Sequence, residues 1–183
     1  MSLTLLAFAL ASLYPTIHFD PSFAMTERYN TEMMINNIAY HYYLANPANF
    51  ANAWSVTVKP ANECSLRHEV LGSESNGTEI TLCIPHGVPT PFIAQGYGNI
   101  ASHEIAHLIV YQRTHDYRLA NNLIHYAQNL ALQLDFRYIH VEHGPYMDNI
   151  AIGVQYWDID KLIGDGELIM LECQTVPGQN AYV

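Results

Sequence analysis

Positive charge is what this sequence has least of. It contains seven Lys and Arg residues against seventeen Asp and Glu residues, which gives a net charge of −10 with histidine neutral. A protein that binds the phosphate backbone of DNA or RNA needs a basic surface, and an anionic membrane attracts the same residues. The charge therefore predicts no nucleic-acid partner and no adhesion to acidic lipids.

Cysteine is also scarce, and the three that occur are Cys64, Cys83 and Cys173. The odd count and the lack of a C-x-x-C pair exclude a disulfide framework and a cysteine-based zinc ribbon. A single pair stays open, but the prediction is three reduced, packed thiols. No Lys or Arg precedes Arg28, so the basic start of a signal peptide is missing as well. These absences favour the cytoplasm over secretion.

Long hydrophobic runs are missing too. The longest, residues 3–14, is mostly apolar but too short to cross a bilayer, so we expect no stable membrane insertion. Its length suits the centre of a signal peptide, yet without a basic start we expect residues 1–25 to be an apolar N-terminal segment docked on the core. No repeat or Pro/Gly/Ser-rich linker divides the chain, so residues 1–183 are predicted to form one domain.

Four stretches have the composition of β-strands. Residues 54–60 end at a proline, and residues 66–72 and 78–85 flank a short polar turn segment. This arrangement predicts a small antiparallel sheet. A further strand is expected at 166–176.

Helical spacing of apolar residues covers much of the remainder. It predicts helices at 26–44, 99–112 and 117–136, and Pro145 is well suited to begin another. Residues 86–98 carry three Gly and two Pro, so they are predicted to be a loop that leads into the second of these helices. Helices and strands in this order indicate an α+β protein.

The helix predicted at 99–112 contains the sequence His-Glu-Ile-Ala-His, from His103 to His107. Residues i and i+4 lie on one face of a helix, so both imidazoles can converge on one ion, and Glu104 can reach a water bound to it. This H-E-x-x-H pattern is typical of zinc sites in which the glutamate acts as general base. Apolar flanks predict a buried helix, in which unpartnered His and Glu side chains would be costly.

A zinc site of this kind needs a third ligand. After the motif, the segment His-Gly-Pro-Tyr-Met begins at His143. With both motifs, residues 54–153 resemble the SprT-like metallopeptidases, the family that includes the Spartan proteases. The resemblance implies a zincin-like fold, with the small antiparallel sheet packed on the buried H-E-x-x-H helix and additional helices around it. It also implies His103, His107 and His143 as zinc ligands and Glu104 as general base.

The sequence departs from the family pattern in three respects. His143 follows His107 by 36 residues, a longer gap than the family usually has, which makes the helix at 117–136 an insertion. The cysteine zinc ribbon is missing, and the acidic charge does not suit DNA-dependent proteolysis, which is therefore not carried over. Zinc also accepts carboxylates. The acidic alternatives as third ligand are Glu142, Asp148, Asp158, Glu167 and Glu172.

Peptide-bond hydrolysis with zinc as cofactor, acting on a protein or peptide substrate, is the function that these residues predict. The alternative is a structural or interaction subunit of a larger assembly, for example a virus particle, with a structural or vestigial zinc site. A weaker third interpretation is an amidase acting on a non-protein amide. The sequence does not indicate the physiological substrate or the oligomeric state.

Overall fold

The computed structural model describes residues 13–64, 78–87, 97–132, 138–142 and 154–167. Three strands, β1 (Thr16–Phe19), β2 (Ser55–Pro60) and β3 (Glu79–Ile84), form one sheet in the order β1-β2-β3. Strands β4 (Ile139–Glu142) and β5 (Val154–Trp157) form a second, two-stranded antiparallel sheet. The helices are α2 (Met25–Ala45), α4 (Gly98–Thr114), α5 (Tyr117–Leu132) and α6 (Ile159–Gly164), with 3-10 turns at Pro47–Phe50 and Ala61–Glu63.

The three-stranded sheet is parallel, so the predicted antiparallel sheet is wrong. Thr16 pairs with Ser55, and Ser55 pairs with Glu79, with all three strands running in the same direction. Alternating apolar residues indicate that a segment is a strand but not which way it runs. Helix α2 connects β1 to β2 and returns the chain to the end of the sheet at which β1 begins, which allows the two strands to pair in parallel. The strand predicted at 66–72 lies outside the described residues.

The predicted helices 26–44 and 99–112 are confirmed as α2 and α4, with ends that differ by at most two residues. Helix α5 confirms the prediction for 117–136 as far as Leu132. The helix expected at Pro145 and most of the strand expected at 166–176 lie outside the described residues. Among the described residues, no helix is long and apolar enough to cross a membrane.

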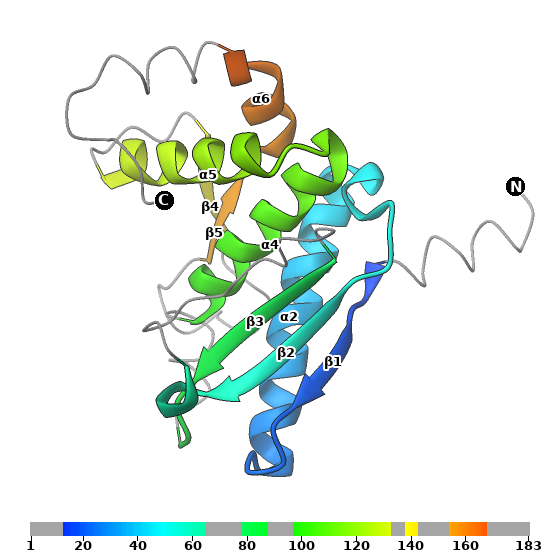
Figure 1. Ribbon diagram of the computed structural model, residues 1–183, viewed down its shortest axis with the longest axis vertical. Helices are drawn as coiled ribbons and strands as arrows, with labels where there is room; N and C mark the ends of the chain where they lie inside the picture. The colour runs from blue at the N-terminus through cyan, green and yellow to red at the C-terminus, as the bar shows by residue number, and fades with distance from the viewer. Residues whose placement is uncertain (1–12, 65–77, 88–96, 133–137, 143–153, 168–183) are drawn as a thin grey trace, which may run out of the picture.

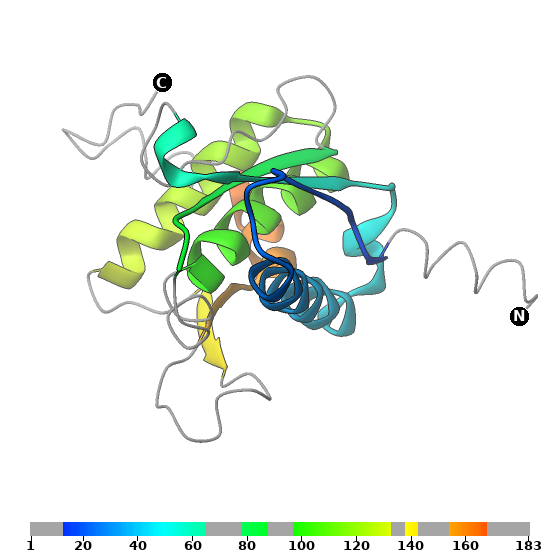
Figure 2. The ribbon, with the colours of Figure 1, turned by 90° about the horizontal axis from the view of Figure 1, so that it is seen from below.

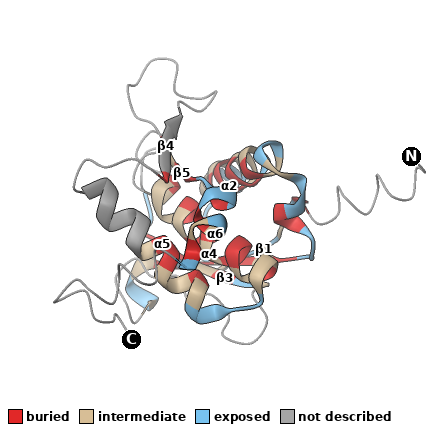
Figure 3. Ribbon diagram, turned by 90° about the horizontal axis from the view of Figure 1, so that it is seen from above, coloured by how far each residue is buried: buried red, intermediate tan, exposed pale blue. Residues whose placement is uncertain are grey.

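The core lies between the sheet and the helices. Helices α2 and α4 lie on the same side of the sheet (Figure 2), and α5 packs against α4 (Figure 1). The buried sides of these elements face one another (Figure 3). Fully buried residues come from every layer; they include Ile35, Val56, Ile80, Ile105 and Leu123. The core thus combines both faces of helix α4 with the inner face of the sheet, which places the histidine motif within it.

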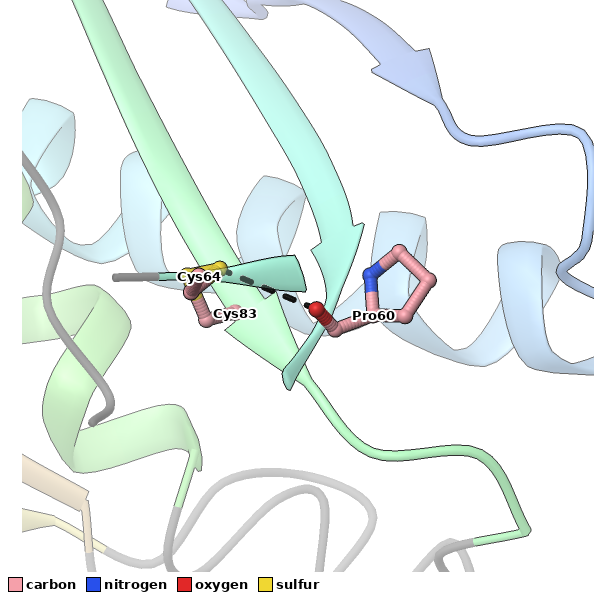
Figure 4. The surroundings of a disulfide bond; sticks show 3 residues. All are labelled: Pro60, Cys64 and Cys83. Carbon is pink, nitrogen blue, oxygen red and sulfur yellow. Dashed lines mark hydrogen bonds between the residues drawn. A yellow bond between two sulfur atoms is a disulfide. The ribbon is translucent and has the colours of Figure 1, made fainter. Parts of the chain in front are cut away.

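A disulfide joins Cys64 to Cys83, so the prediction of three reduced thiols is wrong for these two (Figure 4). Their Cα atoms are 6.2 Å apart. Cys64 follows β2 by one short turn, and Cys83 lies opposite Lys59 in the β2–β3 ladder. The pairing of these two strands brings the thiols together, and spacing alone does not reveal it. Disulfides persist in oxidising compartments, so this bond removes one ground for expecting the cytoplasm.

Candidate metal centre

Helix α4 carries the two motif histidines through the core. Its residues Ala101, Ile105 and Ile109 have no exposed surface, which confirms that the motif helix is buried. The helix ends where His115 adopts a left-handed backbone conformation with φ 55°, and the His115 N–H donates to the Tyr111 carbonyl at 2.7 Å. Only two residues separate this end from the start of α5, so α5 folds back beside α4.

His103 and His107 point toward each other, as the motif predicts. Their Nε2 atoms are 2.9 Å apart, and their rings are nearly perpendicular with centroids 4.6 Å apart. Two nitrogen ligands of a tetrahedral zinc ion lie about 3.3 Å from each other, given zinc–nitrogen bonds of about 2.0–2.1 Å. The pair therefore has nearly the spacing that a shared zinc ion requires.

A third histidine, His125 of α5, completes a cluster that the sequence analysis missed. Its ring centroid lies 5.3 Å from that of His103 and 5.0 Å from that of His107. One ligand nitrogen from each of the three side chains lies within 4.8 Å of the other two. The sequence did contain a signal for this contact. His107 and His125 lie at similar sequence distances on either side of the two-residue link between α4 and α5. Adjacent helices joined by a short link bring such residues together.

Glu104 lies beside this cluster rather than within it. Its side chain is 11% exposed, and its Oε1 atom is 4.0 Å from Nε2 of His103. A carboxylate at this distance does not compete for the nitrogens and can reach a water molecule held between them. A general base must lie within reach of the water that it deprotonates, and this role of Glu104 stays a prediction.

Burial keeps the histidines neutral. It lowers the pKa of His103 to about 3, with a smaller contribution from the nearby His125. Burial also lowers the pKa of His107 well below its ordinary value, helped by His103 and His125 and opposed by the Ala120 carbonyl. Neutral imidazole is the form that binds a metal ion, so the donors are in the correct protonation state at pH 7.

The Ala120 carbonyl also orients the ring of His107. It lies 3.3 Å from Nδ1 of His107, and a proton on Nδ1 can donate to it. The lone pair then resides on Nε2, which faces His103. A backbone acceptor of this kind is a common outer partner of metal-binding histidines. Helix α5 thus contacts the motif histidines through a backbone atom as well as through His125.

Strand β5 closes another side of the cluster. The Trp157 ring lies 5.4 Å from that of His103, nearly perpendicular to it. Two hydrogen bonds hold the strand in place. The Ser102 hydroxyl donates to the Gln155 carbonyl at 2.6 Å. The backbone N–H of Trp157 donates to the Tyr42 hydroxyl at 3.2 Å. Burial raises the pKa of Tyr42, so its hydroxyl stays protonated. These hydrogen bonds fix the residue that precedes His103.

Asp158 and Glu167 are the predicted third ligands whose side chains the structure describes, and neither belongs to the cluster. His143, Asp148 and Glu172 lie outside the described residues. The carboxylate of Asp158 caps α6 by accepting from the Lys161 N–H at 3.1 Å. Two other acids are Glu142, which ends β4, and Glu167, which is exposed.

The chain was compared with known proteins, and no family model, curated protein or solved structure matches it. The resemblance to SprT-like peptidases therefore stays a prediction.

Proposed function

We propose that this protein is a zinc-dependent hydrolase of peptide bonds, with His103 and His107 holding the metal and Glu104 acting as general base. One observation carries the proposal: on a buried helix, two neutral imidazoles face each other at 2.9 Å with a carboxylate 4.0 Å from one of them. When bound in such a site, zinc lowers the pKa of a water molecule and polarises the substrate carbonyl.

The residues of the chain have separate roles. The imidazoles of His103 and His107 supply the uncharged nitrogen donors, and the apolar flanks of α4 keep bulk water from the rings. Glu104 accepts the proton of the attacking water and returns it to the leaving amine. The short distance between its carboxylate and His103 allows this transfer without movement of the helix.

A protein or peptide substrate would bind in an extended conformation. Within the described sheet, β3 is an edge strand, because the strand order is β1-β2-β3. It precedes α4 in the chain and contacts it. An added strand would form backbone hydrogen bonds with β3, which gives affinity with little sequence preference.

An assembly subunit is the second candidate, and the surface of α2 favours it. Met25, Tyr29 and Leu44 are 86%, 63% and 62% exposed. Large apolar side chains along the outer side of one helix are more typical of an interface than of a face in water. This surface could also belong to an enzyme that works within a larger assembly.

The substitution Glu104→Gln tests the hydrolase against the subunit. Glutamine keeps the size of the side chain but cannot accept the proton, so zinc content should stay the same while hydrolysis of an unfolded protein substrate falls by roughly 10²–10⁴-fold. Glu32→Gln, an exposed change on α2, is the matched control and should keep full activity. If the zinc-loaded wild type hydrolyses no peptide or protein in a broad panel, the subunit interpretation replaces the enzyme.

A further inference from the structure

Helix α5 contacts the motif histidines in two places. The Ala120 carbonyl lies 3.3 Å from Nδ1 of His107, and the His125 ring lies 5.3 Å from the ring of His103 and stacks on it at 25°. Ala120, Leu123 and Ile124 of the same helix are buried in the core. The helix is therefore docked by apolar packing and places its polar atoms at the cluster.

The half-buried His125 lies next to aliphatic positions on α5. Neighbouring positions 123 and 124 of α5 have no exposed surface, and their side chains are aliphatic. An aliphatic residue at 125 would also suit a helix packed on α4, whereas an imidazole beside two other imidazoles adds desolvation cost. A shared metal ion would compensate the burial of all three imidazoles at once.

We propose that His125 is the third metal ligand, so that a bound zinc ion ties α5 to the motif helix. The proposal rests on the zinc site of the proposed function but not on hydrolysis. Three nitrogens within 4.8 Å of one another are near enough to converge on one ion, and a zinc site with three histidines leaves one position for water. His143, the ligand implied by the family resemblance, would then not be needed for binding.

The arrangement has a conformational consequence. Two ligands come from α4 and one from α5, so zinc binding adds a cross-link between two helices that apolar contacts already hold together. Metal binding to a site made by two elements stabilises their docked arrangement. Zinc should therefore slow the opening of α5, while α2, which supplies no ligand, should change little.

Zinc affinity and amide hydrogen exchange on the full chain test the proposal together. Affinity is measured by competition with a chelating dye for the wild type, His125→Ala, His143→Ala and Asn121→Ala, the last being a control one turn earlier on α5. Circular dichroism of the metal-free forms verifies that each variant folds. We expect His125→Ala to lose on the order of 100-fold in affinity, because loss of a partner in the outer shell alone costs about 10–100-fold. The other two variants should stay within about twofold of the wild type.

Exchange is compared with and without zinc for peptides from 117–132, with peptides from 25–45 as the internal reference. Zinc should slow exchange in the first set for the wild type and Asn121→Ala, and not for His125→Ala. Wild-type affinity in His125→Ala, or a large loss in His143→Ala, would overturn the assignment of His125 even if the protein is an active peptidase. Loss of affinity in His125→Ala without any hydrolysis by the wild type would support the ligand and remove the enzyme. A wild type that binds no zinc would overturn both.

Discussion

At the scale of single residues, the molecule combines polar groups with an apolar helix. His103, Glu104 and His107 occupy α4 among side chains that have no contact with water. The low pKa of His103, about 3, shows how strongly this setting disfavours a charged ring. Burial of such residues is costly for folding, and this cost is a physical reason for treating them as a site.

His115 allows the energetic cost of a left-handed backbone conformation near that site to be measured. It ends α4 with a φ of 55°, a conformation that favours glycine. We expect His115→Gly to raise the free energy of unfolding by about 1 kcal/mol, because the left-handed conformation costs a residue with a Cβ atom about 1–2 kcal/mol. Chemical denaturation measures the change.

His115→Ala is the matched control, since it removes the imidazole and keeps the Cβ atom. Its stability should remain within about 0.5 kcal/mol of the wild type, as is usual for a surface change. If both variants shift stability by the same amount, the imidazole and not the backbone is responsible.

At the scale of elements, hydrogen bonds between side chains and the backbone connect segments that strand pairing does not connect. The two carboxylate oxygens of Glu27 accept from the Gly87 N–H and the Ala24 N–H, each at 2.8 Å. One bond closes the start of α2, and the other fastens the turn that follows β3. Glu27 thus joins the helix behind the sheet to the end of the strand that leads toward α4.

Glu27→Gln should make the free energy of unfolding depend less on pH in the acid range. The Gly87 and Ala24 N–H groups lower the pKa of Glu27 below its ordinary 4.5 in the folded protein. A lowered folded pKa contributes stability above pH 4.5, and this contribution is lost as the pH falls through the folded value. We expect the variant to be roughly 1 kcal/mol less stable at pH 7 and equal to the wild type near pH 2.

Denaturation at several pH values provides the measurement for this prediction. Glu32→Gln, an exposed change on the same helix, serves as the reference and should follow the wild type at every pH. A constant difference between Glu27→Gln and the wild type from pH 7 to pH 2 would contradict the role given to the ionised carboxylate.

At the scale of the whole molecule, one covalent bond and one core hold the described elements together. The disulfide joins residues 19 positions apart, Cys83 in the edge strand β3 and Cys64 shortly after β2. A closed loop of this size limits the freedom of the unfolded chain and corresponds to about 3 kcal/mol of stability. The bond therefore stabilises the sheet whose last strand, β3, precedes α4 in the chain.

Replacing Cys64 and Cys83 together by alanine should lower the free energy of unfolding by about 3 kcal/mol. Adding a reductant should destabilise the wild type by a similar amount and leave the double variant unchanged. Denaturation curves of both proteins, with and without reductant, provide the comparison. Equal stability of the oxidised wild type and the double variant would exclude a structural role for the bond.

Much of the local structure followed from short-range patterns in the sequence. Apolar spacing located α2, α4 and α5, and the compositions of 54–60 and 78–85 located β2 and β3. The spacing of His103 and His107 predicted that their rings meet, because a helix places residues i and i+4 on one face. Each of these features depends only on residues that are close along the chain.

Features that join distant segments were decided by the tertiary structure. The parallel direction of β1 and β2 depends on the crossover through α2, and the disulfide depends on the register of β2 with β3. His125 reaches the motif because α5 folds back on α4, although nothing in its own segment distinguishes it from an exposed helical histidine. The sequence by itself determined two facing imidazoles and a neighbouring carboxylate. The packing of α5 alone decided that a third imidazole lies beside them, since that contact is made by burying Leu123 and Ile124 in the common core.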